Sequence, residues 1–132
     1  IVNAKTSAHS SLPRQIDNVS IRMVERDGAL RRSAAANVGL QEARGDYLIF
    51  LDDDDWILPS HISNLVQSLQ DNDNIIAAYS STVVKVSGNT VDRYAQEFNK
   101  GLLYIRNYLP IHSVLFRRGA ANGCKFDESF DE

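Results

Sequence analysis

The stretch Gly45-Asp46-Tyr47-Leu48-Ile49-Phe50-Leu51-Asp52-Asp53-Asp54-Asp55-Trp56 decides the fold class of this chain. Its five apolar residues, 47–51, show no polar alternation, which is typical of a central strand that helices cover on both faces. Before it, apolar and small residues recur three and four apart over residues 30–43 and predict a helix. After it, Pro59-Ser60 starts a second predicted helix. Strands that alternate with helices in this way favour an α/β fold.

The remaining sequence adds one strong helical stripe and several strands. The stripe of the second helix has the spacing i, i+3, i+4 and i+7 and consists of Ile62, Leu65, Val66 and Leu69. Strands are predicted at residues 1–2, 19–23, 75–79 and 114–116, a hairpin at 83–91 with its turn at Gly88-Asn89, and a short helical turn at 117–122. Because the later half is richer in strand, the sheet is predicted to be mostly parallel and partly mixed. The 132 residues suit a single domain, 1–132.

The four adjacent carboxylates of Asp52-Asp53-Asp54-Asp55 repel one another, most strongly at the mouth of a buried strand where the dielectric constant is low. A hard divalent cation such as Mg²⁺ or Mn²⁺ would relieve that repulsion, and carboxylate oxygens are its preferred ligands. In open α/β sheets, ligands bind beyond the carboxyl ends of the strands. If the strand geometry continued, Asp52 and Asp54 would lie on one side and the other two on the opposite side. The alternative is a solvated acidic loop that caps the next helix.

Several other sites are excluded by sequence. A calcium loop of the EF-hand type that began at Asp52 would need glycine and glutamate where the chain has Ile57 and Ser63. Phosphate loops of the forms GxxxxGK[ST] and GxGxxG, the zinc motif HExxH and the nucleophile motif GxSxG do not occur.

The composition argues against a nucleic-acid partner and against a membrane span. The chain has 14 basic and 17 acidic side chains and a net charge of -3, which provides no general basic field for nucleic acid. No apolar run approaches the roughly 20 residues of a membrane span. The only cysteine, Cys124, fits a reducing compartment. We therefore expect a cytoplasmic location and, in a longer protein, a peripheral position at the inner face of the membrane.

Three segments together resemble the family 2 glycosyltransferases. They are Arg32-Ser33-Ala34-Ala35-Ala36-Asn37-Val38-Gly39-Leu40, then Ala43 through Trp56, and Gly123-Cys124-Lys125-Phe126-Asp127-Glu128, which is similar to the family's GgFDE turn. The resemblance covers about residues 28 to 130 and implies a GT-A fold. That fold is a three-layer α/β sandwich, here expected to be truncated at both ends. Two departures stand out: Ala36 replaces an expected arginine, and the family's first strand motif is missing.

The resemblance also implies roles for individual residues. Asp54 and Asp52 would bind the divalent cation, Asp52 and Asp53 would contact the nucleotide-sugar, and Asp55 would only cap the turn. Asn37 and Arg32 would lie near the nucleotide; otherwise they are a polar residue and a solvated charge on a helix surface. His112 would lie on the acceptor side.

The same resemblance predicts an inverting reaction with a carboxylate as the base. Asp131 and Glu132 are the candidates within the chain, and the true base is expected beyond its C-terminus. The implied partners are a nucleotide-diphosphate sugar donor and a glycan or lipid-linked acceptor. Two alternatives remain from the sequence: a nucleotidyltransferase, and a non-catalytic fragment that binds a nucleotide or a glycan.

Overall fold

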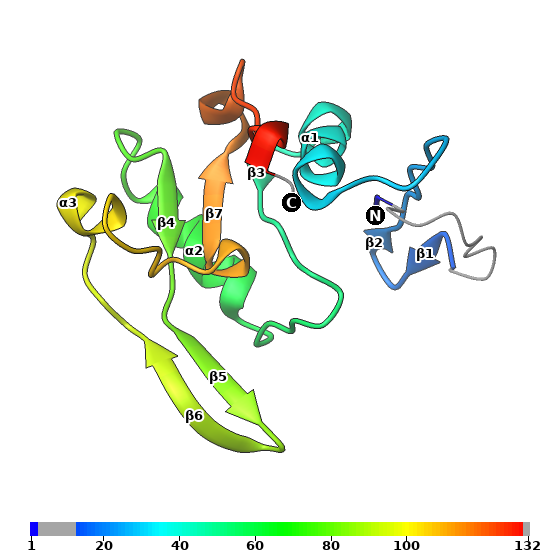
Figure 1. The fold of residues 1–132 in the computed structure, drawn as a ribbon. Coiled ribbons are helices and arrows are strands. Elements are labelled where there is room, and N and C mark those ends of the chain that lie inside the picture. Colours follow the sequence, from blue (N-terminus) through cyan, green and yellow to red (C-terminus); the bar gives the residue numbers. More distant parts are fainter. Residues whose placement is uncertain (3–12, 131–132) are drawn as a thin grey trace. The chain divides into compact units, whose positions relative to one another are not determined.

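The computed structural model describes residues 1–2 and 13–130. The chain divides into two compact units, one formed by residues 1–44 and 121–132 and the other by residues 45–120. Figure 1 shows the path of the chain through both units.

The first unit is built around helix α1 (Arg32–Glu42). Strands β1 (Gln15–Ile16) and β2 (Val19–Ser20) form a short antiparallel hairpin, and Val2 forms a parallel bridge with Val24. The 3-10 helix η3 (Glu128–Phe130) belongs to the same unit. The helix predicted over 30–43 is confirmed within two residues at each end. Only the first two residues of the strand predicted over 19–23 form a regular strand.

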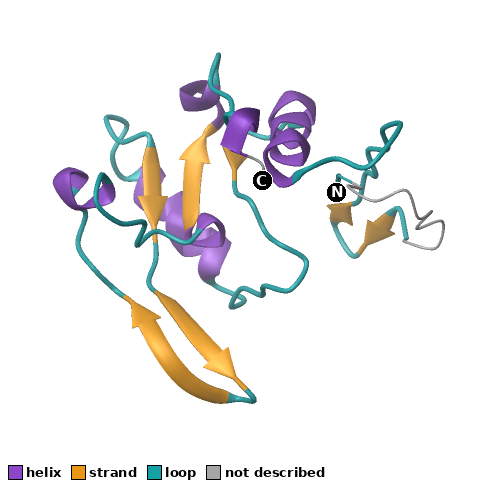
Figure 2. Ribbon diagram, in the orientation of Figure 1, coloured by secondary structure: helices purple, strands orange, loops and turns teal. Residues whose placement is uncertain are grey.

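The second unit contains a three-stranded sheet in the order β3 (Tyr47–Leu48), β7 (Val114–Arg117), β4 (Ala77–Tyr79), which is visible in Figure 2. Both pairings are antiparallel. The predicted mostly parallel sheet is therefore wrong for the strands that the structure describes. The connection from β4 to β7 leaves and returns at one end of the sheet, where the Ser80 amide donates to the Ser113 carbonyl at 3.1 Å. A parallel neighbour would need a crossover to the opposite end.

Helix α2 (His61–Gln70) contacts β4 and β7, and its stripe forms the core of this unit. Leu65 and Leu69 pack with Leu115 of β7, and Leu69 is fully buried. The predicted apolar stripe is confirmed, and it holds the sheet that carries the aspartate run.

The strand predicted over residues 47–51 is shorter than expected, because regular pairing ends at Leu48, which lies opposite Phe116. The Phe50 ring still stacks against Phe116 at 6.3 Å between centroids, but Leu51 is 50% exposed. The prediction of burial on both faces is thus wrong at the end of this segment. A continued register would place Ile49 opposite Leu115 and Phe50 opposite Val114, but regular pairing stops before these residues.

A hairpin of β5 (Thr82–Val86) and β6 (Asn89–Tyr94) extends from the end of β4 (Figure 1). Its two loop residues, Ser87 and Gly88, have φ values of 50° and 82°. Positive φ at both positions is the requirement of a tight type I′ turn, which the glycine meets without strain. The hairpin is confirmed, with its turn one residue earlier than predicted.

The return path to β7 contains α3 (Lys100–Leu103) and the 3-10 helix η1 (Ile111–Ser113), and η2 (Arg118–Ala121) follows β7. The 3-10 helix η2 confirms the short helical turn predicted over residues 117–122. Within the described residues, the structure contains no helix with the length and apolar character that crossing a membrane requires.

Candidate functional site

The aspartate run forms a turn and does not continue the strand. The Asp55 amide donates to the Asp52 carbonyl at 3.2 Å, with Asp53 and Asp54 at the centre of the turn. The expectation of alternating sides for an extended chain is therefore wrong. The turn brings carboxylate oxygens of Asp52, Asp54 and Asp55 within 4.8 Å of one another, and Asp53 is not part of this group.

The three carboxylates suit a hard divalent cation. Asp52 and Asp55 are half-buried and Asp54 is exposed, so the trio is both anchored and accessible. Opposite ligands of an octahedral Mg²⁺ lie about 4.2 Å apart, from metal–oxygen distances near 2.1 Å. A group of oxygens within 4.8 Å is only slightly wider than the shell of one ion, so small rotations of the side chains would close it. The donor set is all oxygen, which fits Mg²⁺ or Mn²⁺.

Asp55 has a second partner that the sequence did not suggest. Its Oδ2 lies 2.6 Å from Nδ1 of His112, whose side chain is 15% exposed. This contact fixes the imidazole ring through one nitrogen, as a carboxylate does when it orients a histidine. The role of turn cap assigned to Asp55 is incomplete, since its side chain pairs with His112 and joins the carboxylate group. Asp55 and His112 are 57 residues apart, so no local pattern could have paired them.

His61, the first residue of α2, holds the backbone beside His112. Its Nε2 lies 3.2 Å from the His112 carbonyl, and its Nδ1 lies 3.3 Å from the Ser80 hydroxyl. Since a carbonyl only accepts, Nε2 carries a hydrogen and donates to it. His61 was not among the predicted site residues. Its polar contacts link the start of α2 to both ends of the β4–β7 connection, at Ser80 and at His112.

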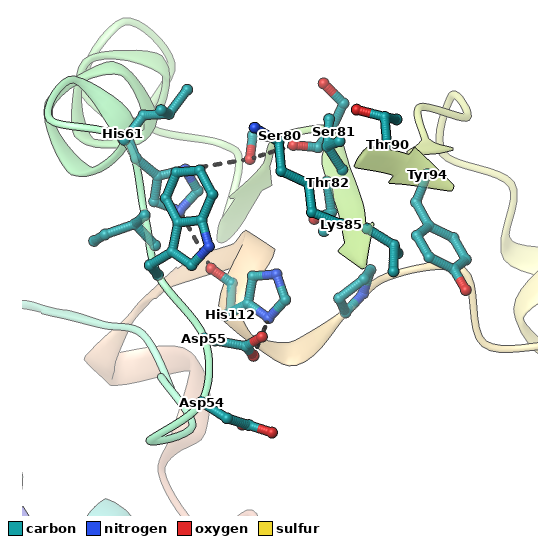
Figure 3. Close-up of a pocket in the computed structure, with 16 residues that line it drawn as sticks. Asp54, Asp55, His61, Ser80, Ser81, Thr82, Lys85, Thr90, Tyr94 and His112 are labelled. Carbon is teal, nitrogen blue, oxygen red and sulfur yellow. Dashed lines mark hydrogen bonds and ion pairs between the residues drawn. The ribbon is translucent and has the colours of Figure 1, made fainter. Parts of the chain in front are cut away.

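These residues border a pocket of about 610 Å³ within the second unit. Figure 3 shows Asp54, Asp55 and His112 on one side of it, and Ser81, Thr90 and Tyr94 on the other. The hairpin β5–β6 contributes much of the second side. His112, predicted on the acceptor side, thus lines a pocket that adjoins the carboxylate group.

Asn37 lies in the first unit, where it is buried with 6% exposure. Its amide nitrogen donates to the Phe126 carbonyl at 3.0 Å and to Glu128 Oε1 at 2.8 Å. Its oxygen accepts from the Phe126 amide at 2.8 Å. The side chain therefore joins α1 to Phe126 and to the first residue of η3, Glu128. The alternative of a polar residue on the helix surface is wrong, since Asn37 is buried and bonded to both neighbours.

Comparison with known proteins identifies the family. The sequence profile described as "Glycosyl transferase family 2" matches residues 9–127, which is most of the chain. This chain belongs to glycosyltransferase family 2. The match includes α1, the aspartate turn, His112 and the first part of the FDE segment.

Individual glycosyltransferases align over parts of the chain. An uncharacterized glycosyltransferase of Acanthamoeba polyphaga mimivirus is 28% identical over 70% of this chain and 38% of its own length. An uncharacterized glycosyltransferase of Haemophilus influenzae is 42% identical over 33% of this chain and 15% of its own length. EpsH of Bacillus subtilis, whose name provisionally describes it as a glycosyltransferase, is 29% identical over 45% of this chain and 17% of its own length. The chain therefore spans less than two-fifths of the relatives it matches.

The structure describes two of the remaining predicted site residues. Arg32 is the first residue of α1, and Asp53 is exposed at the centre of the aspartate turn. Asp131 and Glu132, the candidate bases, lie outside the described residues. Family membership favours a glycosyltransferase over the nucleotidyltransferase that the aspartates alone left open.

Proposed function

We propose that this domain belongs to an enzyme that transfers a sugar from a nucleotide-diphosphate donor to a hydroxyl of a glycan or a lipid-linked acceptor, with inversion. One observation carries the proposal. The aspartate turn groups Asp52, Asp54 and Asp55 in the segment that follows β3, in a chain that matches glycosyltransferase family 2 over residues 9–127. The GT-A three-layer sandwich is the proposed fold of the enzyme's catalytic domain.

The three grouped carboxylates would hold Mg²⁺ or Mn²⁺. When bound there, the ion would neutralise negative charge that develops on the nucleoside diphosphate as it leaves. Asp54 is the most accessible of the three and is the proposed principal ligand, with Asp52 beside it. Asp55 would steady the group, because its carboxylate also holds His112.

The other family roles are part of the proposal. Asp53, Arg32 and Asn37 would contribute to the nucleotide-sugar site. A carboxylate, with Asp131 and Glu132 as the candidates in this chain, would take the proton from the acceptor hydroxyl. The proposed location of the enzyme is the cytoplasm, with a peripheral position at the inner face of the membrane as the secondary proposal.

Calorimetric titration of the chain with UDP, GDP and dTDP, with and without Mn²⁺, tests the donor site. We expect binding of one nucleotide that requires Mn²⁺ and is lost in Asp54→Asn, since the variant removes a charged ligand. The matched control is Asp73→Asn, because the Asp73 side chain is 95% exposed and follows α2, whereas the aspartate turn precedes it. Nucleotide binding that survives Asp54→Asn unchanged would contradict the metal assignment. Absence of any nucleotide binding to a folded chain would contradict the donor site in this domain.

A further inference from the structure

The pocket beside the aspartate turn has the side-chain chemistry of a saccharide site. We infer that it binds a pyranose ring of the acceptor, with the indole of Trp56 as the stacking surface and the hairpin β5–β6 as the opposing wall. This inference rests on the proposed function, because the pocket is assigned to the acceptor and the neighbouring carboxylates to the donor.

Trp56 is exposed in a way that packing does not explain. It directly follows the aspartate turn, lines the pocket and is 64% exposed. Burial of a tryptophan is strongly favourable, so a largely exposed indole in a concave site is more typical of binding than of folding. The Lys85 ammonium lies 5.5 Å from the centroid of the ring. An exposed cation–π contact of this kind contributes only about 0.5–1 kcal/mol, so Lys85 can move aside for a ligand.

The polar lining matches the hydroxyl groups of a sugar. Five hydroxyl side chains line the pocket: Ser80, Ser81, Thr82, Thr90 and Tyr94. A hydroxyl both donates and accepts hydrogen bonds, as a sugar hydroxyl does. Ser80 already pairs with Nδ1 of His61, so the adaptable groups are those of Ser81, Thr82, Thr90 and Tyr94. Among the lining residues, Lys85 is the sole lysine or arginine. The pocket therefore lacks the basic cluster that a phosphate chain would need without a cation.

The size and position of the pocket also fit an acceptor sugar. A volume of about 610 Å³ lies within the usual range of small-molecule sites, about 300–1,000 Å³. Asp54, Asp55 and His112 form one side of the pocket (Figure 3). A ring that stacks on Trp56 would thus be held beside the carboxylates that are proposed to hold the donor. Such positioning of the acceptor is what transfer to its hydroxyl requires.

Trp56 is the only tryptophan of the chain, so its fluorescence reports on this pocket directly. Wild-type protein in EDTA is titrated with glucose, galactose, N-acetylglucosamine, lactose and chitobiose. Sorbitol, which carries similar hydroxyls but no ring, is the control ligand. We expect at least one ring sugar to give a saturable change in emission at millimolar concentration, and sorbitol to give none. Equal, non-saturating changes with every compound would overturn the inference.

Ligand-observed NMR with the best sugar extends the test to variants without the indole. Trp56→Ala is expected to bind roughly tenfold more weakly, as for a central aromatic contact, and Trp56→Phe to restore most of the binding. The matched control is Tyr104→Ala, because Tyr104 is 81% exposed and is not among the lining residues. Full binding by folded Trp56→Ala would overturn the stacking role.

The nucleotide titration separates this inference from the proposed function. Loss of sugar binding together with intact Mn²⁺-dependent nucleotide binding would refute the acceptor pocket and leave the donor site standing. Sugar binding without nucleotide binding would refute the donor site and support the pocket, as expected for a glycan-binding fragment.

Discussion

Replacement of Asn37 by alanine tests how α1 is joined to the segment Phe126-Asp127-Glu128. The change removes three hydrogen bonds of 2.8–3.0 Å, two to the Phe126 backbone and one to Glu128. A typical intramolecular hydrogen bond contributes about 0.5–1.5 kcal/mol net. The bond to Glu128 counts at the low end, since that residue is exposed and water replaces it. We expect a local loss of about 1–3 kcal/mol.

The assay is amide hydrogen exchange at Phe126, whose N–H donates to the Asn37 oxygen. A loss of that size speeds exchange by roughly five- to 150-fold, since about 1.4 kcal/mol is a factor of ten. The control is Gln41→Ala on the exposed surface of the same helix, where we expect a change within about 0.5 kcal/mol. Unchanged amide exchange at Phe126 in folded Asn37→Ala would refute the idea that the Asn37 hydrogen bonds stabilise this segment.

Three further predictions concern stability and titration. Leu69→Ala should cost about 2–5 kcal/mol in urea denaturation, because Leu69 is fully buried between α2 and the sheet. Hydrogen bonds from Arg26 and Arg22 lower the pKa of Glu42 below its ordinary 4.5, so Arg26→Met should raise that pKa in an NMR titration. Because the folded pKa is lowered, the stabilisation is present above about pH 4.5 and is lost as pH falls through the folded value. Gly88→Val should disrupt the β5–β6 turn, because φ is 82° there, and should weaken cross-strand NMR contacts of the hairpin.

Each of these has a clear contrary result. A cost below about 1 kcal/mol for Leu69→Ala would mean that the small core of the second unit is not what stabilises it. An unchanged Glu42 pKa in Arg26→Met would mean that the ion pair with Arg26 does not contribute to stability at acid pH. Intact hairpin contacts in Gly88→Val would show that the turn adapts to a side chain at this position.

The sequence alone determined the elements with strong local patterns. The helix before the aspartates, the amphipathic helix after them and the β5–β6 hairpin all follow from residue spacing or turn chemistry, which act over a few residues. The resemblance around Asn37 and Asp52-Asp53-Asp54-Asp55 also predicted the family, and the profile match over residues 9–127 confirmed it.

Tertiary structure decided what depends on partners distant in sequence. The direction of β7 follows from a connection that returns to the end of the sheet where it began, and regular pairing of β3 with β7 ends at Leu48. Beyond that point the chain turns, which brings Asp55 into the carboxylate group and against His112. Periodicity encodes which face a residue takes within one element, whereas pairing between elements depends on long-range packing. For that physical reason the sequence located the aspartates, and only the fold showed which of them lie together.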